Sequence, residues 1–384
     1  MAPHRIAIDG NEANVQNRVG SNIFAFELLL ELEKQLAHNP NWEITVLLTM
    51  HPLADLPAER PGWKYVILRP KQLWTQWALP KYLFANKDSL DLFFTPGHYA
   101  PRLSPVPYIS AVLDLAFLSH PTLFTLRDRL QLTYWTKYSV KRAQKIITIS
   151  EASKQEIAEK YGIAPKNIVV CYPAIGKVEK ISAQQAQQIL NKYSLPESFF
   201  ISLGTLQPRK NLIRLIEAFE SFSRKQQGLA KISKQQHLVF AGKEGWLAQP
   251  ILDRIAESPF KENIHLTGFI SEQEKWVLLR AATASISIGL KEGFGIPALE
   301  ALEVGTIPVV SNTTSLPEVV GQAGILVDPT NSLAIADGLW QVATLKARDR
   351  AVLRKKGREQ KAKFTWSKTA ATVLDLWQAV LDIS

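Results

Sequence analysis

Two carboxylates, Glu292 and Glu300, flank the turn sequence Gly-Phe-Gly-Ile-Pro and are separated by seven residues. Pro297 suits the first turn of a helix, where its missing N–H costs nothing, and Gly305 suits the end of that helix. The preceding loop therefore leads into a helix N-terminus, where free N–H groups attract phosphate or sugar oxygens. Glutamates placed there can accept hydrogen bonds from sugar hydroxyls. The alternative is that Glu292 caps the helix and Glu300 is solvated.

A second segment places two cations at a helix start. Residues 202–219, SLGTLQPRKNLIRLIEAF, predict a strand, a tight loop with the adjacent Arg209 and Lys210, and an amphipathic helix. Cations at the carboxyl end of a strand suit a pyrophosphate, and a solvated basic loop is the alternative.

A third segment lies near the start of the chain. Residues 9–29, DGNEANVQNRVGSNIFAFELL, predict a strand that leads into a polar loop and then into a long helix opened by Gly20 and Ser21. The alternative to a ligand-binding loop is a simple N-cap at Ser21 or Asn22.

Short apolar runs alternate with amphipathic stretches along the whole chain, which predicts an α/β protein with parallel sheets covered on both faces. At 384 residues the chain is long enough for two domains. The alternation is interrupted by a polar stretch, so we predict one domain over residues 1–172, a linker over 173–196, a second domain over 197–365 and a final helix over 366–384. In such sheets, ligands bind at the carboxyl ends of the strands.

The composition narrows the possible partners. Hydrophobic residues make up 46% and charged residues 21%, as in a globular protein, and no apolar run reaches the roughly 18 residues of a membrane span. The single cysteine, Cys171, excludes an internal disulfide and suits the cytoplasm, and neither a basic leader nor a zinc or Asp-x-Asp metal motif is present. The net charge of +10 favours anionic partners, but it is spread over both halves of the chain, which argues against nucleic acid.

Together the three segments resemble glycosyltransferase family 4, whose GT-B architecture has two facing Rossmann-like domains and an interdomain cleft. The best match is EGFGIPALE, continued by EALEVGTIPVVSNTTSLPEVVGQAGILVDP. GTLQPRKNLIRLIEAF and IITISEASKQEIAEKYG fit in order and spacing, so the resemblance covers essentially the whole chain. It implies retaining transfer of a sugar from a nucleotide donor without a metal or other cofactor. It also implies that the first domain serves the acceptor and the second the donor.

The resemblance assigns roles residue by residue. In catalysis, Lys210, helped by Arg209, would neutralise the departing diphosphate, and Glu292 would hold the donor sugar. Glu300 would bind the ribose hydroxyls. The remaining donor-binding positions would be the loop residues Gly293, Phe294, Gly295 and Ile296 at the sugar, Ile270 at the base, Thr205 after the second-domain strand, and Gly20 and Ser21 beside the phosphate and acceptor.

Two positions depart from the family. Thr205 stands where many members have Arg, and Arg209 is the candidate to compensate. Leu113, followed by Asp114, stands where the family has a histidine that contacts the donor sugar near its C6 hydroxyl. The resemblance therefore leaves the donor hexose open, with His98 and His120 as candidate substitutes on the donor-sugar and acceptor side.

Two aromatic and basic stretches concern the acceptor. Residues 127–145 predict a helix with Lys137, Lys141 and Lys145 on one face, which suits peripheral contact with an anionic membrane or simply a solvated surface. Residues 71–84, KQLWTQWALPKYLF, are our candidate for an acceptor-side loop.

The sequence thus predicts a cytoplasmic glycosyltransferase, for which a peripheral position at the inner face of the membrane is one expectation. It would use a UDP-, GDP- or dTDP-linked donor and a glycan or lipid-linked acceptor of cell-surface polysaccharide. The alternatives are a catalytically silent sugar-nucleotide binding protein and a GT-B sugar-nucleotide epimerase.

Overall fold

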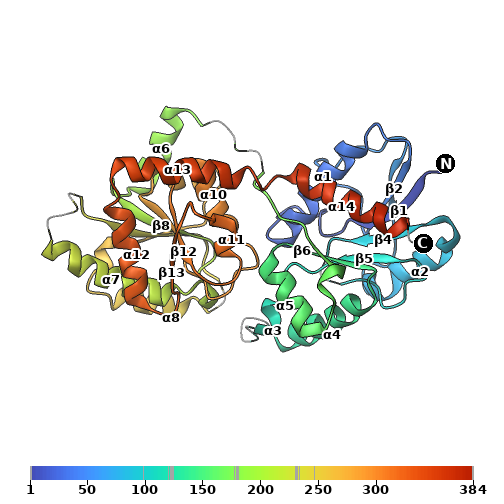
Figure 1. Ribbon diagram of the computed structural model, residues 1–384, viewed down its shortest axis with the longest axis horizontal. Helices are drawn as coiled ribbons and strands as arrows, with labels where there is room; N and C mark the ends of the chain where they lie inside the picture. Colours follow the sequence, from blue (N-terminus) through green and yellow to red (C-terminus); the bar gives the residue numbers. More distant parts are fainter. Residues whose placement is uncertain are drawn as a thin grey trace. The chain divides into compact units, whose positions relative to one another are not determined.

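The computed structural model divides the chain into two compact units (Figure 1). Unit 1 comprises Met1–Pro173 and Thr365–Ser384, and unit 2 comprises Ala174–Phe364. The structure describes residues 2–97, 99–119, 121, 125–176, 178, 181–229, 232, 234–245 and 247–382.

Unit 1 is built on a parallel sheet that has seven strands within the described residues, in the order β3-β2-β1-β4-β5-β6-β7. The strands are β1 (His4–Asp9), β2 (Trp42–Leu48), β3 (Trp63–Ile67), β4 (Leu92–Thr95), β5 (Tyr108–Ala111), β6 (Lys145–Thr148) and β7 (Ile168–Val170). β4 and β5 are buried along their whole length, as expected for central strands of a sheet that has helices on both faces. The helices are α1 (Ser21–Leu36), α2 (Leu79–Ala85), α3 (Ala116–Ser119), α4 (Leu126–Arg142), α5 (Glu151–Tyr161) and α14 (Trp366–Leu381).

The last helix, α14, belongs to unit 1 and packs on α1 (Figure 1). Its Trp377 is fully buried, with ring centroids 5.4 Å from Phe94 and 6.0 Å from Trp42. The Thr369 hydroxyl donates to the carbonyl oxygen of Tyr172, which ties the helix to the segment that follows β7. The final segment of the chain therefore completes the core of the first unit.

Unit 2 repeats the architecture with a parallel sheet of six strands in its described part, in the order β10-β9-β8-β11-β12-β13. The strands are β8 (Phe199–Leu203), β9 (His237–Ala241), β10 (Ile264–Gly268), β11 (Ala284–Ser287), β12 (Pro308–Ser311) and β13 (Ile325–Val327). The helices are α6 (Ala183–Tyr193), α7 (Leu212–Gly228), α8 (Gln249–Ala256), α9 (Glu272–Ala281), α10 (Ile296–Val304), α11 (Leu316–Val320), α12 (Ser332–Ala343) and α13 (Ala347–Lys361). The predicted fold class, α/β with parallel sheets in two domains, is confirmed.

The polar stretch that we predict as a linker is not a plain connection. Residues 183–193 form α6, which starts with a capping box between Ser182 and Gln185 and contacts α9. Leu190 and Tyr193 pack against the apolar cluster to which the side chains of β8 contribute. The helix therefore belongs to unit 2, and its polar composition reflects an exposed outer face.

No helix in the described part of the chain combines the length and the apolar character that a membrane crossing requires.

Candidate functional site

The site in unit 2 is built where β8 and β11 end and where α10 begins. Gly295, in a left-handed conformation with φ 105°, directly precedes α10, and Pro297 occupies its first turn. A left-handed Gly305 with φ 78° ends the helix, so the predicted helix from Pro297 to Gly305 is confirmed. After β8, Gly204 has φ 115°, and a Cβ there would lie 3.5 Å from Cε of Lys210. The lysine side chain thus lies against the strand end, and the positive φ is what favours glycine at this position.

Glu292 joins the two cations that follow β8. Its Oε1 accepts a hydrogen bond of 2.8 Å from Nζ of Lys210, and its Oε2 accepts one of 3.0 Å from Nη1 of Arg209. Glu292 is only 8% exposed. Burial alone would raise its pKa, but the two cations outweigh burial and lower the pKa below its usual value. The structure thus brings the three predicted catalytic residues together as a charged cluster.

Buried serines fix the loop that carries Glu292. The Ser315 hydroxyl lies 2.8 Å from the carbonyl oxygens of both Glu292 and Phe294. The Ser311 hydroxyl donates to the carbonyl oxygen of Gly289 at 2.8 Å. These bonds satisfy buried backbone acceptors and hold the loop against β12. No separate sequence signal marks either serine.

Glu300 lies in α10 and is 6% exposed, which excludes the solvated helix face. Its Oε1 accepts a bond of 2.5 Å from Nζ of Lys275, which also binds Glu272 at 2.7 Å. Burial raises the pKa of Glu300, and the Lys275 ammonium offsets only part of that rise. For Lys275 burial lowers the pKa, but the two carboxylates outweigh it, so the pKa is raised and the lysine is charged. Lys275 was missed because its surroundings in the sequence are those of an ordinary polar helix.

Asn211 is a further residue that sequence reasoning missed. It is buried and left-handed, with φ 61°, and immediately follows Lys210. Its Nδ2 donates to the carbonyl oxygens of Ile288, at 3.2 Å, and Pro329, at 2.7 Å. The asparagine thereby ties the loop that carries Arg209 and Lys210 to the end of β11. Only the tolerance of asparagine for left-handed backbone could have suggested it.

The other predicted donor-binding residues of unit 2 lie in the loops after β8 and β10 and at the start of α10. The Phe294 side chain is buried against Phe364, with ring centroids 5.4 Å apart, so its ring belongs to the core and does not face a ligand. Ile270 follows β10 and packs partly on the core, and Thr205 lies beside Gly245 in the loop after β8. Gly293 precedes this phenylalanine, and Ile296 is the first residue of α10.

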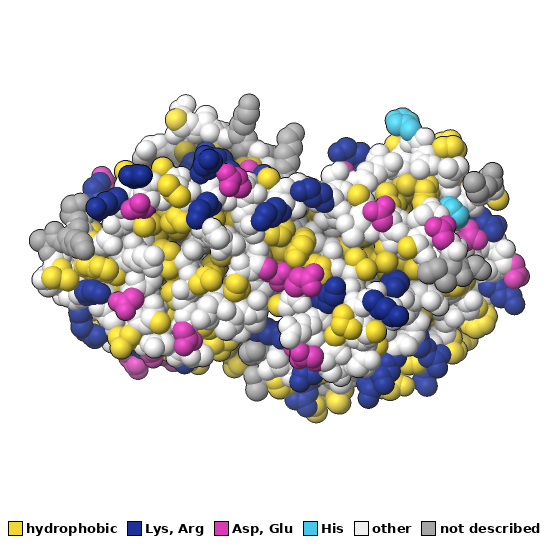
Figure 2. Space-filling model, in the orientation of Figure 1, with side chains coloured by type: hydrophobic (Ala, Val, Ile, Leu, Met, Phe, Trp, Pro, Cys, Tyr) yellow, Lys and Arg dark blue, Asp and Glu magenta, His cyan; other side chains and the backbone are white. Residues whose placement is uncertain are grey.

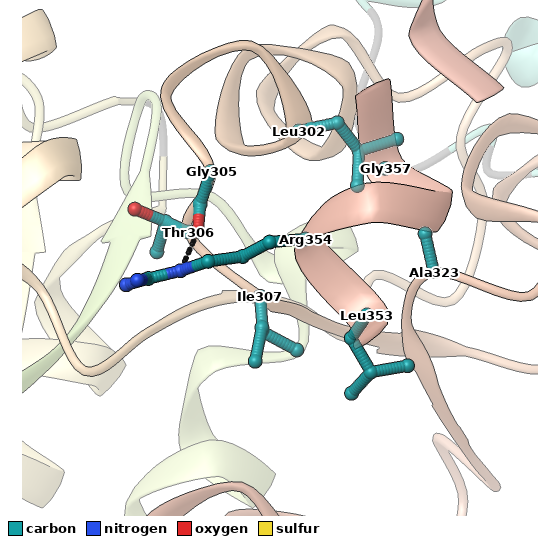
Figure 3. A pocket seen from close by; sticks show the side chains of 8 residues that line it. All are labelled: Leu302, Gly305, Thr306, Ile307, Ala323, Leu353, Arg354 and Gly357. Atoms are coloured by element: carbon teal, nitrogen blue, oxygen red, sulfur yellow. Dashed lines mark hydrogen bonds between the residues drawn. The ribbon is translucent and has the colours of Figure 1, made fainter. Parts of the chain in front are cut away.

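The far end of α10 is anchored away from the carboxylates. Nε of Arg354, from α13, donates to the carbonyl oxygen of Gly305 at 2.9 Å, and apolar side chains line the small pocket around this contact (Figure 3). The arginine satisfies a carbonyl group that the helix itself leaves free.

In unit 1 the start of α1 is already occupied by a carboxylate. Oε2 of Glu12 accepts bonds from the Ser21 hydroxyl, at 3.2 Å, and from Nδ2 of Asn22, at 2.7 Å. The cap residue is Gly20, with φ 50°, and no side chain caps the helix. The N-cap interpretation of Ser21 or Asn22 is therefore wrong, because both side chains turn toward Glu12.

Leu113 is buried after β5, and its carbonyl oxygen accepts a bond of 3.4 Å from the Thr148 hydroxyl. Asp114 accepts a bond of 2.9 Å from the backbone N–H of Ala116, which opens α3. His98 and His120 lie outside the described residues.

Within the described parts of the chain, no group of three or more His, Cys, Asp or Glu side chains is arranged to hold a metal ion. Cys171 is a free, buried thiol, and burial raises its pKa to about 12. It is an inert thiol at neutral pH.

Two α/β units, each with a parallel sheet, together with this site define the class of protein as one with a GT-B glycosyltransferase fold. Over almost the whole chain the fold matches solved structures of that class. The sucrose-phosphate synthase of Thermosynechococcus elongatus aligns with a TM-score of 0.69 and 17% identity, covering 99% of this chain and 100% of that one. Anabaena HepE in complex with UDP-glucose aligns with a TM-score of 0.70 and 14% identity, covering 98% and 99%. At these identities the likeness concerns the fold.

Sequence comparison points to the same class of protein. Residues 185–360 match the family model described as glycosyl transferases group 1. The serotype-specific mannosyltransferase WbdA of Escherichia coli is 31% identical over 248 residues, which are 63% of this chain but only 30% of that protein. The O-antigen chain mannosyltransferase B of Escherichia coli is 27% identical over 320 residues, which are 82% and 79% of the two chains. Residues 185–360 therefore match the group 1 glycosyltransferases, and the chain as a whole has the GT-B fold; assignment to family 4 is consistent with these matches.

Proposed function

We propose that this protein is a retaining, metal-independent glycosyltransferase that moves a sugar from a nucleotide donor to a glycan or lipid-linked acceptor in cell-surface polysaccharide biosynthesis. The observation that supports this best is the charged cluster in unit 2. It combines a buried carboxylate with two cations at the carboxyl ends of parallel strands, where nucleotides bind in such folds.

In the proposed reaction the bond between the sugar C1 and the diphosphate breaks while a bond from C1 to an acceptor hydroxyl oxygen forms on the same face. The acceptor proton passes to the departing phosphate oxygen, so no protein nucleophile is needed. Lys210 and Arg209 stabilise the negative charge that grows on the diphosphate, and Glu292 keeps both cations in place. Oε1 of Glu300 is bonded to Lys275, and we assign its Oε2 to the ribose hydroxyls.

The names of the relatives favour mannose as the transferred sugar and GDP as the carrier. One relative in Xanthomonas campestris and one in Mycobacterium tuberculosis carry GDP-mannose in their names. Leu113 argues for a donor without a hydroxyl at C6, because a buried hydroxyl that faces leucine lacks a partner. GDP-mannose and its 6-deoxy counterpart are therefore the matched pair to compare first.

A panel of UDP-, GDP- and dTDP-sugars tests this proposal by thermal shift, by release of the nucleoside diphosphate and by NMR of the transferred anomer. Transfer with retention, undiminished by EDTA, is the expected result. Stabilisation by a donor without slow hydrolysis or transfer would favour the silent binding protein. Conversion to an isomeric sugar nucleotide would favour the epimerase.

We also propose that α4 rests on an anionic membrane from the cytoplasmic side. Lys137, Lys141 and Arg142 are exposed on this helix, as are the apolar Leu126 and Leu130. Figure 2 shows Lys and Arg side chains gathered over the part of unit 1 where Figure 1 labels α4. Sedimentation with vesicles should then require an anionic lipid and weaken with salt.

One part of this helix was predicted wrongly. α4 ends at Arg142, and Lys145 is the first residue of β6, where its Nζ donates to Asn167 and to the carbonyl oxygen of Lys166. Lys145 therefore does not share a helical face with the other lysines.

A further inference from the structure

The end of β1 in unit 1 carries a carboxylate that the proposed reaction does not use. Asp9 accepts bonds from Nε1 of Trp74, at 3.3 Å to Oδ1 and 3.2 Å to Oδ2, and from the backbone and side chain of Asn11 on Oδ1. No ion pair joins Asp9 to a lysine or arginine in the described parts of the chain. Among the described residues, the hydrogen bond that Oδ2 accepts comes from the shared indole N–H, which leaves acceptor capacity on a partly exposed carboxylate.

The segment that supplies the indole has an unusual backbone. Leu73 is left-handed, with φ 56°, and is 68% exposed, although leucine strongly disfavours that conformation. A π-helix over Trp74–Ala78 follows, and Trp77 within it is 60% exposed. Strained residues and π-helical turns concentrate at binding sites, where surrounding contacts hold them.

A second carboxylate lies close by. A Cβ added to Gly97, after β4, would lie 3.5 Å from Cγ of Glu12, so that side chain reaches from the loop after β1 to the end of β4. Burial raises the pKa of Asp9 to about 6, the bonds from Trp74 and Asn11 counteract this, and the charge of Glu12 adds to the rise. Two neighbouring acidic groups that no described lysine or arginine pairs with repel phosphate, whereas carboxylates beside an indole bind the hydroxyls and apolar face of a neutral sugar.

We propose that Asp9, oriented by Trp74, binds hydroxyls of a neutral acceptor sugar at the carboxyl end of β1, and that this subsite excludes a phosphorylated sugar. The proposal rests on the proposed function and names the acceptor chemistry. It also changes the expectation for Gly20 and Ser21, because Glu12 occupies the α1 start that would otherwise attract a phosphate.

The test compares Asp9→Asn and Trp74→Phe with the control Asp91→Asn. Asp91 binds the backbone N–H of Arg5 at 2.7 Å, so its variant also loses a carboxylate bond in unit 1 but not at this site. The probes are methyl glycosides of mannose, glucose, galactose and N-acetylglucosamine, together with mannose 6-phosphate, observed by saturation-transfer NMR. For the glycoside that binds, its octyl derivative serves as acceptor in a transfer assay.

We expect one neutral glycoside to bind the wild type and mannose 6-phosphate not to bind. Asp9→Asn should raise the acceptor KM about tenfold or more and leave the donor KM unchanged, because a bond to a charged group is lost. Trp74→Phe keeps an aromatic ring, although a smaller one, but removes the indole N–H, and should raise the acceptor KM less. Asp91→Asn should lower thermal stability only.

An acceptor KM that stays within twofold of wild type in both site variants would overturn the proposal and leave Asp9 as a structural carboxylate. So would binding of mannose 6-phosphate in preference to the neutral glycosides. If Asp9→Asn does not fold, Trp74→Phe decides the question. Failure of the proposed function would give a different result. The wild type would then show no donor turnover, while the NMR experiment would still report whether a neutral sugar binds and whether Asp9→Asn weakens that binding.

Discussion

Replacing Glu292 by Gln tests whether this carboxylate competes with a diphosphate for Lys210 and Arg209. The change removes one negative charge at nearly constant volume, 2.8 Å from one cation and 3.0 Å from the other. The amide offers one acceptor oxygen and directs an N–H group toward the second cation. Both cations are then left without a counter-charge in the ligand-free protein.

The size of the effect follows from burial. Breaking a buried ion pair by removing one partner costs about 3–5 kcal/mol. Because the Arg209 side chain is 32% exposed and water screens it, we expect about 2–3 kcal/mol. A domain of this size loses about 2–4 °C of Tm per kcal/mol, so the melting temperature should fall by about 4–12 °C. If diphosphate binding recovers about 1.4 kcal/mol of this loss, the affinity for GDP or UDP rises about tenfold.

The assay is calorimetric titration with GDP and UDP combined with thermal melting with and without each nucleotide. Glu303→Gln is the matched control, because Glu303 also lies in α10 and pairs with Lys361 at 2.5 Å. The control should lose stability without a change in diphosphate affinity. An affinity for both diphosphates that is unchanged or weaker in Glu292→Gln would refute the reasoning that the carboxylate competes with the diphosphate for the two cations.

Three further predictions concern other parts of the chain. Glu300→Ala should weaken binding of both the nucleoside diphosphate and the intact donor by about 1–3 kcal/mol in calorimetric titration, and unchanged affinity would contradict the ribose assignment. Burial lowers the pKa of His237 and of His265, which lie 2.9 Å apart between ring nitrogens, and the charge of His265 lowers that of His237 further. The folded state therefore binds fewer protons than the unfolded state at mildly acidic pH. The contribution of this pair to the free energy of unfolding should be fully present above about pH 7 and be lost as the pH drops through the ordinary histidine pKa of about 6.5. Denaturation measured from pH 5 to 8 should show a flatter pH dependence for His265→Gln. Leu113→His should shift the ratio of kcat/KM from the 6-deoxy donor toward the matched hexose donor, and a wild type that strongly prefers the hexose, with that preference lost in the variant, would contradict the reasoning.

Local signals predicted the elements of the site well. Pro297 and Gly305 constrain the backbone through their own chemistry, so the start and end of α10 could be read without knowing the fold. The alternation of apolar runs and amphipathic stretches is likewise a local pattern, and it predicted the parallel sheets.

Contacts between distant residues were not accessible in this way. Lys275 meets Glu300 from another helix, and nothing in the residues around it distinguishes it from a solvated lysine. Similarly, Ser21 suits an N-cap by its type, but the tertiary position of Glu12 decides where its hydroxyl points. The amphipathic pattern of α14 predicted a packed helix, but a pattern cannot say which core the helix joins.

The membership of α14 in unit 1 sets the order in which the protein can be made. A ribosome releases the seven strands of unit 1 first, and then has to synthesise all of Ala174–Phe364 before Trp377 can cover Phe94 and Trp42. During that interval unit 1 has an uncovered apolar face, which can bind chaperones or cause aggregation. Unit 2, in contrast, is encoded by one continuous segment. Truncating the last helix should therefore harm solubility in the cell much more than its 16 residues suggest.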